Sequence, residues 1–117
     1  MGKVLVVDDA AYVRAKTVKL LEEYGYETVE ACDGAEAVRR YRAVKPDVVL
    51  MDITMPVMDG VQAVREIRKE DPNARIVMCS ALGQQSMIVE ALKAGARDFI
   101  LKPYQPDRLL TAVRNLL

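Results

Sequence analysis

Short apolar segments alternate with amphipathic segments five times along this chain, and that alternation limits the possible folds more than any other feature. The segments expected to be strands are 4–7, 27–31, 47–52, 75–80 and 98–102. After each of them, apolar residues recur at helical spacing within residues 13–24, 37–44, 61–67, 87–92 and 106–116. Regular β-then-α repetition of this length predicts an α/β fold: a parallel sheet with helices on both faces.

The strand order can be predicted from which segments are most apolar. Segment 4–7 and residues 48–51 within segment 47–52 are entirely apolar, so these two strands should be central, whereas 27–31 alternates and should lie at an edge. Right-handed crossovers leave few topologies for five such units. The order 2-1-3-4-5, the flavodoxin-like order, is therefore predicted, with five helices. A chain of 117 residues suits one domain, expected to span 1–117.

Polar side chains follow four of the five expected strands. Asp8 and Asp9 follow the first, Asp52 ends the third, Ser80 ends the fourth and Lys102 ends the fifth. Folds of this type bind ligands beyond the carboxyl ends of the strands, where the strand order reverses. Since the first and third strands are neighbours in the predicted order, three carboxylates should converge there. Such crowding is unfavourable without a cation, and Mg²⁺ prefers oxygen ligands of this kind.

These residue types together suit an acyl-phosphate site. Asp52 could attack phosphorus, Lys102 and a metal could neutralise the incoming charge, and Ser80 could donate a hydrogen bond. The chain has no histidine, which excludes the commonest general base and metal ligand. Lys plus Arg and Asp plus Glu both total 17, so net charge does not favour nucleic acid or membranes. Cys32 and Cys79 are interpreted as packed, reduced thiols.

Each polar residue also has a simpler interpretation. Asp9 could cap the first helix, Ser80 could be a satisfied strand-end hydroxyl, and Lys102 could be a solvated surface charge. Asp59, in Asp59-Gly60, is interpreted as a helix cap alone. The case for a site therefore depends on the joint placement of the polar residues.

Four motifs in order resemble the response-regulator receiver family from end to end. They are Asp8-Asp9, residues 51–56 (MDITMP) with Asp59-Gly60, Ser80-Ala81, and Lys102-Pro103. Within the family, residues 8–11, 79–85 and 98–100 are most similar to the single-domain chemotaxis regulators.

The resemblance implies a role for each matching residue. Asp52 would be the phosphoacceptor, supplied by a sensor histidine kinase of the chemotaxis type. Asp9 would ligate Mg²⁺ directly, Asp8 mostly through water, and Thr54 through its backbone carbonyl. Lys102 would pair with the phosphate and precede a cis bond to Pro103.

The resemblance also implies a switch. Ser80 would move toward the phosphoryl group, and Phe99, where tyrosine is common in chemotaxis regulators, would turn inward. The fourth helix, fifth strand and fifth helix would then form an output face. Ile88 and Phe99 would be its apolar residues, although Ile88 packing in the core is an equally good interpretation. Thr54 and Leu82 occupy positions that tune phosphate lifetime in the family.

The expected partners are the kinase, a flagellar motor switch protein and a phosphatase, with no nucleic acid and no membrane. The protein is expected to be a cytoplasmic monomer and no enzyme beyond its own phosphorylation and dephosphorylation. Because the sequence stops with the last helix at Leu117, a stand-alone regulator is favoured over a receiver from a DNA-binding regulator.

Two further functions compete. One is an aspartyl-nucleophile phosphohydrolase, because residues 52–54 (DIT) fit a D-x-T loop, although Thr54 is no general acid. The other is a flavin-binding flavodoxin, although acids stand where its phosphate loop would need hydroxyls.

Overall fold

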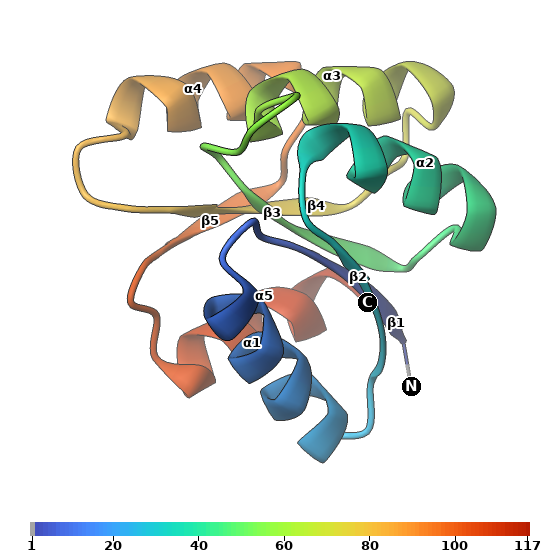
Figure 1. The fold of residues 1–117 in the computed structure, drawn as a ribbon, viewed down its shortest axis with the longest axis vertical. Coiled ribbons are helices and arrows are strands. Elements are labelled where there is room, and N and C mark those ends of the chain that lie inside the picture. The colour runs from blue at the N-terminus through green and yellow to red at the C-terminus, as the bar shows by residue number, and fades with distance from the viewer. Residues whose placement is uncertain (1) are drawn as a thin grey trace.

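The computed structural model describes residues 2–117, in which five strands form one sheet between two layers of helices (Figure 1). The strands are β1 (Lys3–Val7), β2 (Glu27–Ala31), β3 (Val48–Asp52), β4 (Ile76–Ser80) and β5 (Asp98–Leu101). The helices are α1 (Ala11–Glu23), α2 (Gly34–Val44), α3 (Gly60–Glu70), α4 (Gln85–Ala94) and α5 (Pro106–Leu116). Strands and helices alternate throughout, as predicted.

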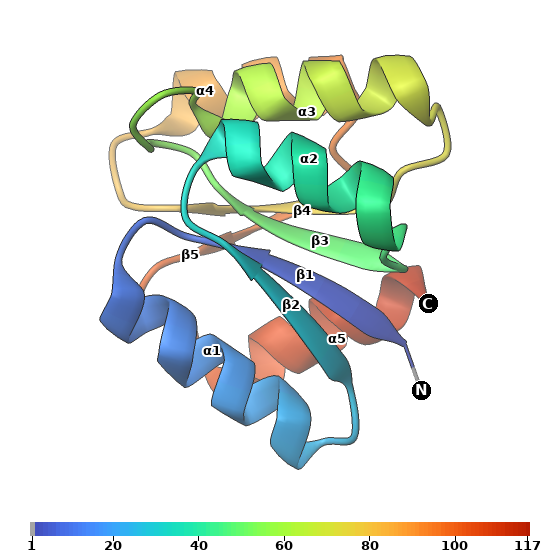
Figure 2. The ribbon, with the colours of Figure 1, turned by 45° about the vertical axis from the view of Figure 1, so that its right-hand side comes forward.

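The sheet has the order β2-β1-β3-β4-β5, and all its pairings are parallel, which confirms the predicted topology. Helices α2, α3 and α4 cover one face and α1 and α5 cover the other (Figures 1 and 2). The register sets Val7 beside Met51 and Ser80 beside Leu101. The chain segments that follow β1, β3, β4 and β5 therefore leave the sheet at the same edge.

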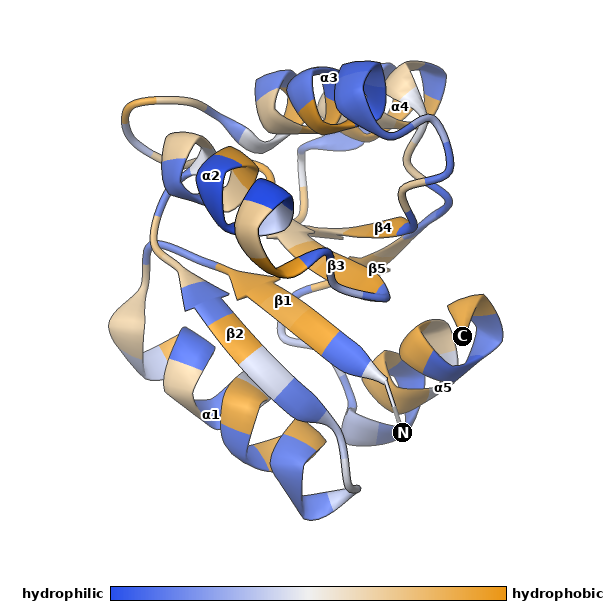
Figure 3. Cartoon of the chain, turned by 90° about the vertical axis from the view of Figure 1, so that its right-hand side faces the viewer, coloured by the Kyte–Doolittle hydropathy of each residue, from blue (hydrophilic) through white to orange (hydrophobic). Residues whose placement is uncertain are grey.

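The two faces of the sheet belong to two separate hydrophobic clusters. Leu5, Val49 and Met78 pack with α2, α3 and α4, whereas the alternate residues Val6 and Leu50 pack with α1 and α5. Figure 3 shows β1 and β3 as largely hydrophobic, while the edge strand β2 also contains hydrophilic positions. A central strand is buried on both faces, so it needs apolar residues at every position.

The helical spacing within residues 13–24 predicts that Val13, Thr17, Leu20 and Tyr24 share the buried face of α1, and the structure differs in part. Thr17 is buried as expected, but Tyr24 is 56% exposed and Leu21 is completely buried. Helix α1 ends at Glu23, so Tyr24 lies at its C-cap and no longer follows the helical face. After the turn, Tyr26 packs into the core in its place.

The predicted burial of Cys32 was wrong, and the structure decides between the two interpretations of Ile88. Cys32 is exposed because it follows the edge strand β2, whereas Cys79 is buried in β4 as expected. Ile88 is 6% exposed and belongs to the core cluster, so its interpretation as a core residue is confirmed. The exposed apolar residues of α4 are Val89 and Leu92.

Within residues 2–117, no helix has the length and apolar character needed to cross a membrane.

Candidate acidic site at the carboxyl ends of the strands

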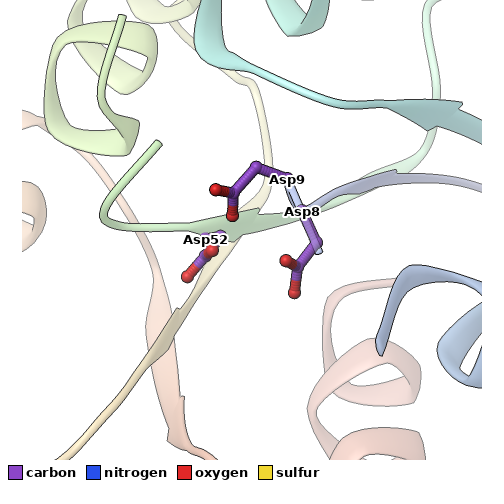
Figure 4. A group of neighbouring side chains, drawn as sticks. All are labelled: Asp8, Asp9 and Asp52. Carbon is purple, nitrogen blue, oxygen red and sulfur yellow. The ribbon is translucent and has the colours of Figure 1, made fainter. Parts of the chain in front are cut away.

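Three carboxylates meet where β1 and β3 end (Figure 4). One oxygen atom from each of Asp8, Asp9 and Asp52 lies within 4.8 Å of the other two. Asp8 and Asp52 are buried, and Asp9 is exposed. The parallel register of β1 and β3 produces this meeting, because Asp8 and Asp52 directly follow the paired residues Val7 and Met51.

Lys102 reaches into this group from the end of β5. Its Nζ lies 2.7 Å from Asp8 Oδ2 and 3.1 Å from Asp52 Oδ1. Its backbone N–H donates to the Ser80 carbonyl, and its peptide bond to Pro103 is cis, as the resemblance implied. Lys102 is thus half-buried and paired twice, which excludes its interpretation as a solvated surface charge.

The electrostatics of the cluster favour neutralisation of Asp52. Burial raises the pKa of Asp52 to about 6; the Lys102 charge opposes this rise and the Asp8 charge adds to it. Burial lowers the pKa of Lys102, but its hydrogen bond to Asp8 and the charges of both carboxylates outweigh burial, and the net shift is upward. The charge of Lys102 therefore offsets only part of the rise that burial causes in the pKa of Asp52.

Ser80 has a buried hydroxyl with no hydrogen-bond partner anywhere in residues 2–117. Leaving such a group unpaired costs about 1–3 kcal/mol. The simpler interpretation, a satisfied strand-end hydroxyl, is therefore wrong. Because β4 lies beside β3, this donor is on the strand next to Asp52, where it suits an anionic ligand.

The loop after β3 holds Asp52 in place. The Ile53 N–H donates to Asp52 Oδ1 at 2.9 Å, and the Gly60 N–H donates to the Ile53 carbonyl at 2.6 Å. Asp59 caps α3 by accepting from Gln62 N–H, which confirms its structural interpretation. Asp9 is no cap: the N-cap of α1 is Ala10, without a side-chain hydrogen bond.

Within residues 2–117, the side chains of Thr54 and Phe99 make no hydrogen bond to the three carboxylates. The Thr54 hydroxyl accepts from Gln84 Nε2 at 2.7 Å, and the role of its carbonyl stays a prediction. Phe99 is 38% exposed on β5. Gln84 was missed by sequence reasoning; the available signal was an amide three residues after Ala81, at the start of a helix.

The donor set fits Mg²⁺. The oxygen atoms are hard ligands, two of the three acids are buried beside one another, and exposed Asp9 leaves access for the waters that Mg²⁺ retains. The three carboxylates that would hold the ion, Asp8, Asp9 and Asp52, are among the ligands named from the sequence.

A cleft of about 420 Å³ lies next to this cluster, between α1 and the segment that follows β5. Its lining is mostly apolar and includes Tyr12, Leu20, Pro103 and Tyr104, and Lys102 of the cluster also lines it. Apolar walls do not bind a phosphoryl group or a divalent ion, so the chemistry belongs to the carboxylates and not to the cleft.

Comparison with known proteins points to one family. The model of the response regulator receiver domain matches residues 4–114. The chemotaxis protein CheY of Thermotoga maritima is 54% identical, over 99% of this chain and 98% of that protein.

Solved structures agree in fold. A chain in the crystal structure of the CheX–CheY–BeF₃–Mg²⁺ complex from Borrelia burgdorferi has a TM-score of 0.91 and 36% identity, covering 97% of this chain and 87% of that one. NtrX from Brucella abortus has a TM-score of 0.93 and 34% identity; the match covers 99% of this chain but only 26% of NtrX.

Proposed function

Because the chain belongs to the response regulator receiver family, we propose that Asp52 accepts a phosphoryl group from a sensor histidine kinase. The observation that supports this most is the setting of Asp52. It is buried, lies 3.1 Å from Lys102 Nζ, shares the site with two other carboxylates, and has the unpaired hydroxyl of Ser80 on the neighbouring strand.

In the proposed reaction, an Asp52 oxygen attacks the phosphorus of a phosphohistidine. The new O–P bond forms as the P–N bond breaks, and the imidazole leaves with the electron pair. Lys102 balances negative charge on the transferred group, and the Ser80 hydroxyl donates a hydrogen bond to one of its oxygens. Asp9 and Asp52 would hold Mg²⁺, with Asp8 through water and the Thr54 carbonyl, and the ion would supply further positive charge. The protein then catalyses only its own phosphorylation and dephosphorylation.

The biological setting that we propose is chemotaxis, in the cytoplasm, with a monomeric protein. Full-length similarity to a chemotaxis protein supports this setting. The proposed output face contains α4, β5 and α5, and its exposed apolar residues are Val89, Leu92, Phe99 and Leu101. An amphipathic helix of a partner could dock there, and a flagellar motor switch protein is the proposed partner, with a phosphatase as a second one.

The proposal is tested by mass spectrometry after incubation with acetyl phosphate, with and without Mg²⁺. We expect one phosphoryl group per chain, only with Mg²⁺, and none on Asp52→Asn. Asp107→Asn, an exposed acid at the start of α5, is the matched control and should be labelled like the wild type. Labelling of another residue in Asp52→Asn, or multiple turnover of a small phosphate ester, would contradict the proposal; the second result would favour the phosphohydrolase.

A further inference from the structure

Gln84 joins two loops that border Asp52, and the reaction proposed above does not use it. Its Oε1 accepts from the Ala81 N–H at 2.8 Å, and its Nε2 donates to Thr54 Oγ1 at 2.7 Å. Ala81 directly follows Ser80 at the end of β4, and Thr54 lies two residues after Asp52. One carboxamide therefore connects the loop after β3 with the loop after β4.

The local backbone explains how Gln84 reaches both loops. Gly83 has a φ of +89°, a conformation that glycine adopts readily, and the chain turns there before α4 begins. Gln84 follows as the N-cap residue of α4, half-buried, and its side chain does not cap the helix. Instead, the amide oxygen accepts the hydrogen bond from Ala81 and closes the short loop 81–84, and the amide nitrogen donates to Thr54 in the other loop.

A phosphoryl group on Asp52 would compete with this arrangement. It adds strongly accepting oxygens beside Ser80, whose buried hydroxyl has no partner in residues 2–117. If Ser80 moves toward those oxygens, the adjoining Ala81 N–H moves with it. A charged phosphoryl oxygen is a stronger acceptor than the neutral amide of Gln84, so the bond from Ala81 to Gln84 would be exchanged.

We propose that Gln84 is a positioning residue of the switch. Its carboxamide holds the loop after β4 in the unphosphorylated arrangement, and phosphorylation of Asp52 releases it from Ala81. The proposal rests on the proposed function of Asp52. Because the two hydrogen bonds favour only one of two conformations, they lower the affinity of the site for a phosphoryl group. Loss of Gln84 therefore favours the activated conformation.

The test is titration of the phosphoryl mimic beryllofluoride at saturating Mg²⁺, followed by amide chemical shifts. Gln84→Ala should bind beryllofluoride roughly three- to tenfold more tightly, the change expected from losing about one net hydrogen bond in the unliganded state. Thr54→Val removes only the hydrogen bond from Gln84 to Thr54 and should give a smaller increase in the affinity for beryllofluoride. The affinity for Mg²⁺ alone should be unchanged in Gln84→Ala, and the Ala81 amide resonance should shift even without ligand.

Gln85→Ala is the matched control. Gln85 is the first residue of α4, exposed, and its side chain takes part in none of the hydrogen bonds recorded for residues 2–117. Equal or weaker beryllofluoride binding by Gln84→Ala, beside normal binding by the wild type, would overturn the role of Gln84 alone. A gain of the same size in Gln85→Ala would also overturn it. Failure of the wild type to bind beryllofluoride would overturn the proposed function of Asp52 as well.

Discussion

At the scale of single residues, Asp52 shows most clearly how the site opposes the stability of the fold. Its pKa is about 6 in the folded protein, against an ordinary value of 3.8, mainly because the carboxylate is buried. Between these values the folded protein binds a proton that the unfolded chain has released. The contribution of Asp52 to the free energy of unfolding therefore falls as the pH rises from about 4 to about 6, and the fall is complete above that range.

We accordingly expect Asp52→Asn to raise the free energy of unfolding by about 1–3 kcal/mol at pH 7.5 without Mg²⁺, because a shift of about two pKa units sets the upper bound. The gain should disappear as the pH falls from about 6 to about 4. Urea denaturation in EDTA across this pH range measures it. A gain that is the same at every pH would show that desolvation of the Asp52 charge is not its cause.

Asp9 is the exposed member of the three carboxylates, so its loss should affect the cation more than the fold. We expect Asp9→Ala to weaken Mg²⁺ binding by about tenfold or more, because a site of few carboxylates loses one charged ligand. Isothermal titration calorimetry measures the change. Glu23→Ala, an exposed acid at the end of α1, serves as the control. Equal Mg²⁺ affinity in Asp9→Ala would place the ion elsewhere.

At the scale of elements, the start of α3 packs directly against the end of β3. A Cβ atom added at Gly60 would overlap the Asp52 carbonyl oxygen, which is backbone and cannot turn aside. We expect Gly60→Ala to lower the free energy of unfolding by about 2–4 kcal/mol, because helix and strand must separate. Thermal denaturation monitored by circular dichroism tests this.

Gly83→Ala is the companion variant. No atom lies within 4 Å of a Cβ built at Gly83, and only its φ of +89° opposes substitution. The cost should be about 1 kcal/mol, from backbone strain alone. If the two variants were equally destabilised, the close contact between α3 and β3 would not be the reason for the glycine at position 60.

The elements and their order could be predicted from the sequence because apolar periodicity and strand-end residues are local signals. The side that each helix buries was less predictable where a helix ends: Tyr24 leaves the buried face at the C-cap of α1, and Leu21 fills the core. Ile88 was ambiguous because α4 is apolar on more than one side. The bridge from Gln84 to Thr54 depends on the conformations of two loops, which no periodicity encodes.

At the scale of the whole molecule, the proposed switch links the acidic site to the face formed by α4, β5 and α5. Phe99 is partly exposed on β5, and β5 pairs with β4, which ends at Ser80. With beryllofluoride and Mg²⁺, amide chemical-shift changes should therefore extend from the strand ends through residues 86–104.

Asp52→Asn provides the control for that experiment and should show no such changes. Shifts confined to the immediate neighbours of Asp52 in the wild type would mean that the site binds the mimic without switching the face. Ile88 offers a second probe: because it packs in the core, its amide reports repacking of α4 and not contact with a partner.

Gly2 and Leu117, the first and last residues that the structure describes, lie close together at the end of the sheet opposite the acidic site (Figure 2). The Gly2 carbonyl accepts from the Glu27 N–H, and Arg75 donates to the Leu116 carbonyl nearby. A short peptide tether could therefore join the ends, and new ends could be opened in a distant surface loop, giving a circular permutant with the same sheet order. A second protein fused at either end would likewise lie away from Asp52 and would not block access to it, so this fold is suited to insertion into other proteins.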